Sequence, residues 1–292
     1  MKSPKPLFPI LCFSLTLILQ FTAEAQTAKD QFQFVSIDFP GSVSTVANGI
    51  NTRGEIVGTY LNVVSATDHH GFLLTDGKFR TIDVPAGTLG TDLFGINDGG
   101  AMVGEFFDAQ NHGHGFAGAN GTFAQIDFPN ASETAAIGIN DSGLIVGAYI
   151  NPAGDQHGFL LSHGRLSTID VPGALETVAR GISDSGEIVG FFFDAEVRLH
   201  GFVLSKGIFR TVDVPGGSIA VLGVNSVGTL VGDFTTGAKG SAFLLREGVF
   251  QTIDIPGATG SSAQGINAGG GIVGTYLDSN FTFHGFFAVA PR

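Results

Sequence analysis

Apolar positions in this chain come in short runs of β-branched and aromatic residues, and glycine or a polar pair interrupts each run after five to eight residues. No segment after the first 31 residues keeps a 3.6-residue period for more than a turn or two. Short apolar runs between turn residues are typical of β-strands. The pattern therefore predicts an all-β chain without helices.

The runs recur with a period of about 43 residues, so the chain contains six copies of one repeat. Each copy contains a Gly-Ile-Asn-like triplet, which begins at Gly49, Gly95, Gly138, Gly181, Gly223 and Gly265. A Val-Gly pair, a His-Gly-Phe triplet and an Ile-Asp-Val-Pro-like end follow in a fixed order.

Each copy divides into four short strands. The first ends at Gly-Ile-Asn, and the Asn-x-x-Gly turn that follows suits a hairpin whose glycine takes a positive φ. In the third copy the next strands are expected over residues 144–149, 157–161 and 165–171, and Pro172 ends the last one because it lacks a ladder donor.

Four antiparallel strands per period predict a six-bladed β-propeller. The chain starts with a lone fourth strand at residues 32–39 and ends with a third strand at 283–290. Pairing of these two segments would close the ring and remove two open sheet edges. A β-solenoid is the structural alternative, but its coils are usually shorter than this period.

The order Gly-Ile-Asn, Gly, Ile-Val-Gly, His-Gly-Phe resembles the HAF repeat, a family of extracellular repeat proteins named after a His-Ala-Phe triplet. The resemblance covers residues 32–291, with glycine in place of the middle alanine in five copies and Ser241-Ala242-Phe243 in the fifth. It implies an extracellular or cell-surface bacterial protein, and it brings no activity and no functional residue.

The first 25 residues have the pattern of a secretory signal: Lys2 and Lys5, an apolar run, and Ala23-Glu24-Ala25 before the expected cleavage site. The predicted organisation is a signal peptide (1–25), a linker (26–31) and a single propeller domain (32–292). The chain is expected to be secreted, periplasmic or on the cell surface, without a membrane span.

The net charge and the cysteine content limit which partners and which covalent or metal sites the chain can have. The full chain has a net charge of −12, and removal of residues 1–25 makes it more acidic, which argues against nucleic acid or anionic membrane. The single cysteine, Cys12, lies in the predicted signal, so disulfides and thiolate metal sites are excluded from the mature chain. A monomer without cofactor is expected.

Two polar residue types recur and are predicted to be structural anchors. They are His70, His114, His157, His200, His284, and Asp38, Asp83, Asp127, Asp170, Asp213, Asp254. One histidine per repeat places neighbours on different sheets, which argues against a shared metal ion. Asp before a Pro-Gly loop commonly caps its own backbone.

The loop between the second and third strands is the first candidate for ligand binding, because it varies between copies and lies on the same face as the connections between blades. Its leading residue is Asp108, Asp194 or Asp278 in three of the copies. The alternative is that this residue only starts an Asx turn.

A second candidate is an asymmetric polar mouth of the central channel. Arg180 stands where the other copies have Asn48, Phe94, Ile137, Leu222 and Gln264. A charge there requires a partner or water. The hypothesis groups Arg180 with Asp92, Glu133 and Glu176.

No nucleophile elbow, zinc-binding helix, phosphate loop or dinucleotide fingerprint is found. The leading interpretation is a non-catalytic binding module that recognises a glycan or a protein through one face. The alternative is a carbohydrate-active hydrolase or lyase, which would need two convergent carboxylates in a deep pocket.

Overall fold

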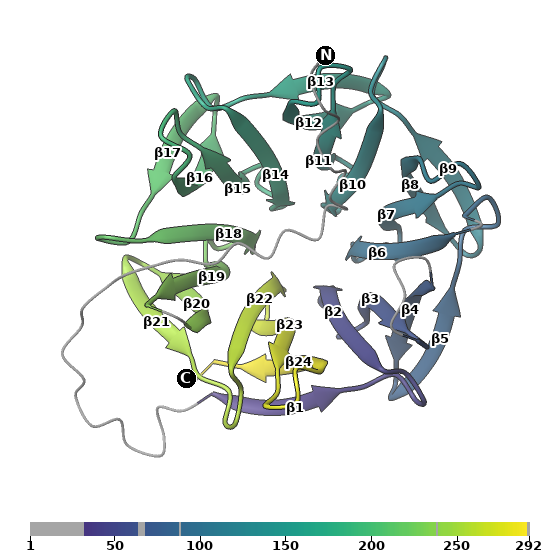
Figure 1. The fold of residues 1–292 in the computed structure, drawn as a ribbon, viewed down its shortest axis with the longest axis vertical. Coiled ribbons are helices and arrows are strands. Elements are labelled where there is room, and N and C mark those ends of the chain that lie inside the picture. Colours follow the sequence, from purple (N-terminus) through teal and green to yellow (C-terminus); the bar gives the residue numbers. More distant parts are fainter. Residues whose placement is uncertain (1–31, 64–67, 88, 238, 291–292) are drawn as a thin grey trace, which may run out of the picture.

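The computed structural model describes residues 32–63, 68–87, 89–237 and 239–290, and within these ranges every regular element is a β-strand. The predicted signal peptide and linker lie outside the described residues. No helix in the described part of the chain is long and apolar enough to cross a membrane. The strands are arranged radially around a central axis (Figure 1), which confirms the prediction of an all-β propeller.

The 24 strands follow the six sequence repeats. The first repeat has β2 (Ser44–Ile50), β3 (Ile56–Leu61), β4 (His69–Thr75) and β5 (Lys78–Ile82). The second has β6 (Gly90–Ile96), β7 (Met102–Phe107), β8 (Gly113–Ala119) and β9 (Thr122–Ile126). The third has β10 (Glu133–Ile139), β11 (Ile145–Ile150), β12 (Gln156–Ser162) and β13 (Arg165–Ile169). The fourth has β14 (Glu176–Ile182), β15 (Ile188–Phe193), β16 (Leu199–Ser205) and β17 (Ile208–Val212). The fifth has β18 (Ser218–Val224), β19 (Leu230–Thr236), β20 (Lys239–Arg246) and β21 (Val249–Ile253). The sixth has β22 (Gly260–Ile266), β23 (Gly271–Leu277) and β24 (Phe283–Val289), joined by β1 (Gln33–Ile37).

Hydrogen bonding groups these strands into four four-stranded sheets and one eight-stranded sheet, which contains β2 to β9. Within the eight-stranded sheet, a single parallel pairing of His69 with Gly90 joins β4 to β6. Hydrogen bonding alone thus gives five sheets, whereas the sequence predicts six blades.

The two ends of the described chain meet in one sheet. Strand β1 pairs antiparallel with β24, from Gln33 opposite Val289 to Ile37 opposite Gly285. This confirms the predicted closure of the last sheet by the N-terminal strand. Strands β1 and β24 are shorter than the expected segments 32–39 and 283–290, whereas β12 is longer than the expected 157–161.

Local turn chemistry determines where the strands end. Gly143, in the Asn-x-x-Gly turn of the third repeat, has φ 75°, as predicted. In the turn between β12 and β13, both His163 (φ 50°) and Gly164 (φ 77°) have positive φ, which matches the right-handed twist of a tight hairpin. Strand β13 ends at Ile169, three residues before Pro172.

The recurring glycine of Gly-Ile-Asn lets the innermost strands approach one another closely. A Cβ at Gly49 would lie 2.8 Å from the carbonyl oxygen of Phe94 in the next repeat, and a Cβ at Gly265 would lie 3.0 Å from that of Asn48. The same approach is found between every pair of consecutive repeats. A ring of inner strands this tight therefore needs glycine at this position.

The core lies between neighbouring sheets, and one phenylalanine per repeat forms its centre. These residues, all fully buried or nearly so, are Phe72, Phe116, Phe159, Phe202, Phe243 and Phe286. Each ring lies against the glycine of the Val-Gly pair: a Cβ at Gly147 would be 2.8 Å from the Phe159 ring. The sequence repeats are therefore packing units.

Candidate functional site

The recurrent histidines and aspartates contact each other across the two outer strands of five of the six repeats. His157 Nδ1 lies 3.0 Å from a carboxylate oxygen of Asp170, and His200 Nδ1 lies 2.6 Å from a carboxylate oxygen of Asp213. His284 contacts Asp38 at 2.8 Å and so ties β24 to β1. The pairs His70–Asp83 and His114–Asp127 follow the same pattern. The fifth repeat has Ser241 at the histidine position, opposite the strand that ends before Asp254.

One face of the molecule carries both the loops between second and third strands and the connections between repeats, because consecutive strands are antiparallel. We call this the loop face. The opposite face carries the Asn-x-x-Gly turns. The loop face is therefore where segments of variable sequence are exposed together.

Four loops of the loop face share one backbone structure. In the second repeat, Asp108 Oδ1 accepts hydrogen bonds from the backbone N–H groups of Gln110 (2.8 Å) and His112 (2.9 Å). Asn151, Asp194 and Asp278 make the equivalent pairs of bonds in their own loops. These backbone donors lower the pKa of Asp108, Asp194 and Asp278. The structure thus places these three aspartates at the start of Asx turns, where they fix the loops.

The fourth residue of each of these loops has a left-handed backbone. It is Gly154 (φ 89°) in the third repeat, but Asn111 (φ 62°), Val197 (φ 61°) and Phe281 (φ 61°) in the others. Positive φ is unfavourable for a β-branched or bulky residue by about 1 kcal/mol or more. Val197 is nevertheless 68% exposed and Phe281 80% exposed, so neither gains burial in return.

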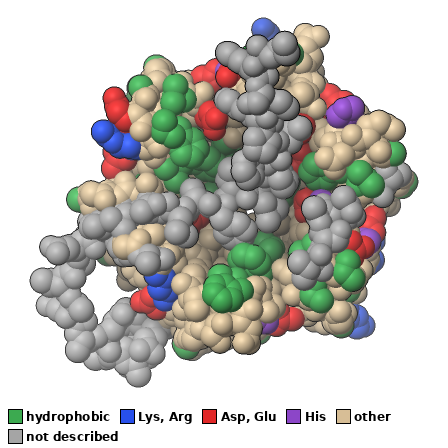
Figure 2. All heavy atoms as spheres, viewed as in Figure 1, with side chains coloured by type: hydrophobic (Ala, Val, Ile, Leu, Met, Phe, Trp, Pro, Cys, Tyr) green, Lys and Arg blue, Asp and Glu red, His purple; other side chains and the backbone are tan. Residues whose placement is uncertain are grey.

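Hydrophobic side chains are exposed elsewhere on this face as well. Leu175, just before β14, is about half exposed, and its backbone N–H donates to the carbonyl of Phe193 at the end of β15. In Figure 2, hydrophobic side chains gather over β14–β16 and again over β22–β24. The loop that carries Val197 joins β15 to β16, and the loop that carries Phe281 joins β23 to β24.

Inside the ring, Arg180 belongs to a polar network that connects three repeats. Its Nη2 donates to Gln264 Oε1 (2.9 Å), Gln264 Nε2 donates to Ser262 Oγ (3.0 Å), and Ser262 Oγ donates to Asp233 Oδ1 (2.9 Å). Burial raises the pKa of Asp233 to about 7, although the Ser262 bond and the Arg180 charge act in the opposite direction. The network thus places a carboxyl that titrates near neutral pH between β19 and β22.

Asp92 and Glu133 lie in a different cluster, around Glu105. Asp92 accepts from His69 Nδ1 (2.9 Å), and its register partner on the next strand is Glu105. Burial, together with the charges of Asp92 and Glu133, raises the pKa of Glu105 well above its usual value. Burial also raises the pKa of Glu133.

The predicted polar mouth therefore separates into two parts. Arg180 contacts Gln264, whereas Asp92 and Glu133 surround Glu105, and Glu176 is half-buried as the first residue of β14. No group of three or more acidic or histidine side chains within the described ranges is placed to hold a metal ion.

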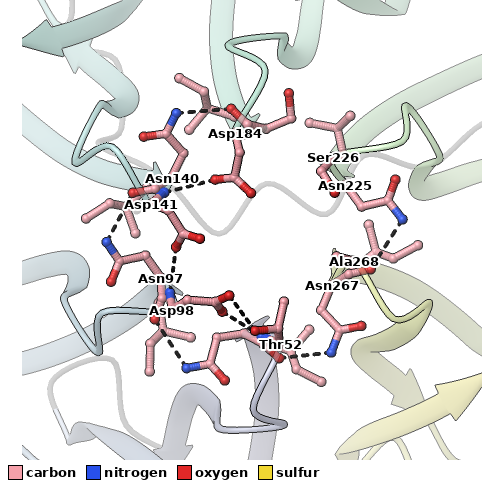
Figure 3. Close-up of a pocket in the computed structure, with 18 residues that line it drawn as sticks. Thr52, Asn97, Asp98, Asn140, Asp141, Asp184, Asn225, Ser226, Asn267 and Ala268 are labelled. Carbon is pink, nitrogen blue, oxygen red and sulfur yellow. Dashed lines mark hydrogen bonds between the residues drawn. The ribbon is translucent and has the colours of Figure 1, made fainter.

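At the opposite face, the Asn-x-x-Gly turns surround a small pocket on the axis (Figure 3). Side-chain amides link successive turns: Asn51 Nδ2 donates to the carbonyl of Asn97 (3.2 Å), and Asn97 Nδ2 donates to that of Asn140 (3.1 Å). The links continue from Asn140 to Ser183, from Asn225 to Asn267 and from Asn267 back to Asn51. The fourth repeat has Ser183 in place of asparagine, and its hydroxyl contacts Ser185 Oγ (2.8 Å).

Three carboxylates form an arc around this pocket. Asp98 accepts from the backbone N–H of Thr52 (2.7 Å), Asp141 from that of Asp98 (2.8 Å), and Asp184 from that of Asp141 (3.0 Å). The pocket has a volume of about 80 Å³. This is small beside typical ligand clefts of roughly 300–1,000 Å³. The arrangement joins successive turns into one rim.

Sequence reasoning missed Glu105 and Asp233, which occupy the same repeat position. The other copies have Thr59, Ala148, Phe191 and Thr275 there, directly after the glycine of Val-Gly. A carboxylate at a position that is small or apolar elsewhere was the available signal. Sequence reasoning also missed His69, which directly precedes the recurrent His70 and has no histidine counterpart in the other copies.

Comparisons with known proteins give a fold but no family. No protein-family model matches the chain, and no curated protein matches it. Solved propellers do match. TolB from Acinetobacter baumannii has a TM-score of 0.56 and 11% identity over 85% of this chain and 65% of that one.

Two further solved structures cover most of both chains. A mutant of the Aleuria aurantia lectin, in complex with Fucα1-6GlcNAc, has a TM-score of 0.54 and 10% identity over 84% of this chain and 91% of that chain. The β-propeller domain of the Trilobed protease from Pyrococcus furiosus, described as having an open velcro topology, has a TM-score of 0.51 and 7% identity over 85% and 98%. These similarities support the propeller fold. The functions of these proteins differ, so the fold alone does not select one.

Proposed function

We propose that this protein is an exported, non-catalytic binding module, a six-bladed propeller that recognises a glycan through its loop face. The observation that carries the proposal is the pair of loop tips at Val197 and Phe281. Both are exposed, and both hold a backbone conformation that glycine would adopt without strain. Strained and exposed residues on a rigid scaffold are typical of recognition sites.

Six blades are the number that agrees best with the strands. The eight-stranded sheet counts as two blades, because one residue pair alone joins its halves. Six sequence repeats of four strands support the same number. A solved structure of the Aleuria aurantia lectin is also described as a six-bladed β-propeller, with a TM-score of 0.51.

Export and family membership rest on the sequence. The signal-like segment over residues 1–25 supports secretion to the periplasm, the cell surface or the medium. The repeat order supports a place among the HAF-repeat proteins. A monomeric state is part of the proposal, because the outer edge strands of the sheets are short, five residues each, and give little length for pairing with another copy.

A glycan is the ligand that the chemistry of the loops favours. The Asx turns fix the loop backbones before binding, so little conformational entropy is lost when a ligand binds. Phe281 offers an exposed aromatic ring on which the C–H face of a sugar can stack, and Asn111 offers an amide for its hydroxyl groups. The solved lectins with the same fold, including one in complex with α-methyl-L-fucoside, show that propellers bind sugars.

The hydrolase or lyase alternative has less support. Asp92 and Glu105 are convergent carboxyls, and the pKa of Glu105 is raised, as a catalytic pair would require. However, Glu105 is only 2% exposed, so a polysaccharide does not reach it. The pair therefore calls for a different explanation.

Glycan-array binding by the purified secreted chain, with polysaccharide turnover measured in parallel, tests the proposal. We expect binding without turnover. Phe281→Gly should abolish or weaken binding at least tenfold, while stability is unchanged or rises by about 1 kcal/mol because the strain is relieved. Val227→Ala, at an exposed valine in a turn of the opposite face, is the matched control and should bind normally. Turnover of any polysaccharide, or unchanged binding by Phe281→Gly and Val197→Gly, would contradict the proposal.

A further inference from the structure

Two buried carboxyl groups in the second repeat each have an oxygen without a hydrogen-bond donor. Asp92 is 4% exposed and Glu105 is 2% exposed, and Asp92 Oδ1 and Glu105 Oε1 both lack a partner. A buried polar atom without a partner costs about 1–3 kcal/mol, and more when it is charged. Asp92 and Glu105 are cross-strand partners, so a single hydrogen bond between them could satisfy both oxygens.

The backbone places the two side chains on the same side of the sheet. Asp92 on β6 and Glu105 on β7 are direct Cα partners in an antiparallel pair. Side chains of such partners have Cβ atoms about 4.5–5.5 Å apart, within reach of a hydrogen bond between their carboxyl groups. Two ionised carboxylates cannot make this bond, because both only accept.

We propose that Glu105 keeps its proton at neutral pH and donates it in a hydrogen bond to Asp92 Oδ1, so that Glu105, Asp92 and His69 form one proton-dependent clasp between the first and second repeats. One proton then satisfies both orphan oxygens. The other Asp92 oxygen, Oδ2, lies 2.9 Å from His69 Nδ1. His69 lies on β4 and is itself the residue that pairs with Gly90 of β6, so the clasp lies at the pairing that joins these two strands.

The charged groups around the pair favour this state. Burial opposes protonation of His69, but its hydrogen bond to Asp92 and the Asp92 charge outweigh burial, and the pKa of His69 is raised. A protonated His69 balances Asp92, which leaves Glu105 as the neutral member. Glu133, on β10 of the third repeat, adds negative charge near Glu105 and so further opposes its ionisation.

The clasp is connected to the loop face. Glu133 interacts electrostatically with His112, which belongs to the Asx-turn loop of the second repeat. A Cβ at Gly113, directly after this loop, would lie 2.2 Å from Glu105 Oε1, so the backbone there rests on the buried carboxyl. Ionisation of Glu105 at alkaline pH would therefore disturb β8 and the loop above it. This inference is independent of whether the loop binds a glycan.

The test is the infrared absorption of protonated carboxyl groups in the full secreted chain. Asp233→Asn serves as the background, because burial raises the pKa of Asp233 to about 7 and its carboxyl would add to the signal at neutral pH. At pH 7.5 we expect one protonated carboxyl, lost in the further variant Glu105→Gln. Asp92→Asn should lower the midpoint of its ionisation by at least one pH unit, a tenfold change in proton affinity. Asp127→Asn, at an exposed carboxylate, is the matched control and should change nothing.

Three results would overturn the proposal. The first is the absence of a protonated carboxyl at pH 7.5. The second is its persistence in Glu105→Gln. The third is an unchanged midpoint in Asp92→Asn, which would mean that burial alone holds the proton. If a variant does not fold, a ¹³C NMR titration of glutamate carboxyls in the unaltered chain decides instead, since ionisation of every glutamate below pH 7 contradicts the clasp.

Discussion

At the scale of single residues, Ser183 interrupts the ring of side-chain amide hydrogen bonds that links the Asn-x-x-Gly turns on the face opposite the loop face. Asparagine in the other repeats donates to a carbonyl of the next turn and accepts a backbone N–H from within its own turn, as Asn140 does from Leu144 (3.0 Å). Ser183 accepts the equivalent N–H, that of Glu187 (3.1 Å), but its side chain is too short to reach the next turn. The missing link would join Ser183 to the carbonyl of Asn225.

Ser183→Asn should therefore complete the ring and stabilise the protein by about 1 kcal/mol, the net value of one hydrogen bond. Urea unfolding at pH 7 measures the difference. Ser183→Ala is the control, and it should destabilise because it removes the acceptor for the Glu187 N–H. Equal stability of Ser183→Asn and the unaltered chain would show that the ring geometry does not accept a sixth amide.

Asp233 makes stability depend on pH, with a definite sign. Its pKa in the folded protein is about 7, above the ordinary value of about 4. Between these two values the folded state holds a proton that the unfolded state has released, so stability falls as pH rises through this window. The loss approaches a tenfold decrease in the folding constant per pH unit.

Asp233→Asn should remove this part of the dependence, because an amide does not titrate. Denaturant unfolding at pH 4.5, 6 and 8 measures it, with Asp155→Asn, at an exposed carboxylate of a loop, as the control. In Asp233→Asn, but not in Asp155→Asn, the fall of the unfolding free energy with rising pH should become less steep, by an amount equal to at most one bound proton. A slope identical in the two variants would refute the assignment.

At the scale of elements, each sheet packs a buried phenylalanine of its third strand over the glycine opposite it on its second strand, as Phe159 does with Gly147. Phe159 is fully buried, and its ring packs against Gly147. A Cβ added at Gly147 would meet both this ring and the Ala135 carbonyl oxygen, so no larger residue fits at this position. Phe159→Ala should cost about 3–5 kcal/mol through lost burial and the cavity left behind. Thermal or urea unfolding checks this, and Phe281→Ala, at an 80% exposed ring, should stay within about 0.5 kcal/mol. A similar loss in both variants would contradict the packing argument.

The elements were predictable from sequence because the same local requirement occurs six times. Each turn glycine, each Val-Gly pair and each His-Gly-Phe triplet marks a fixed point in the strands, and the structure has its strands between these points. Strand ends were less predictable. Strand β13 stops at Ile169, earlier than the expected end at residue 171, and Asp170 just beyond it contacts His157.

The candidate site was less predictable, because repetition conceals exceptions. The Asx-turn loops follow from Asp108, Asp194 and Asp278, but the left-handed backbone of Val197 and Phe281 does not follow from those residue types. The contacts of Arg180 with Gln264, and of Asp92 with His69, join different repeats. Their partners depend on how repeats are rotated about the axis, which no spacing in the sequence specifies.

At the scale of the whole molecule, the seam between β1 and β24 decides whether the ring stays closed. Gln33 and Val289 are both exposed and are direct partners in this seam. Partners in an antiparallel pair have Cα atoms about 4.5–5.5 Å apart, a distance that a disulfide spans. The only natural cysteine is Cys12, in the predicted signal, so two introduced cysteines should pair only with each other.

The double variant Gln33→Cys with Val289→Cys should raise the free energy of unfolding by about 4 kcal/mol when oxidised, because the crosslink closes a loop that includes nearly the whole domain. The reduced form of the same variant is the matched control and should resemble the unaltered chain. Mass spectrometry confirms the crosslink, and guanidinium unfolding measures both forms. If the ring opens first at this seam, as a closure made by a single strand suggests, the oxidised form should also unfold more slowly. Equal unfolding rates in the two forms would place the first opening elsewhere, and the single pairing between β4 and β6 would then be the next seam to crosslink.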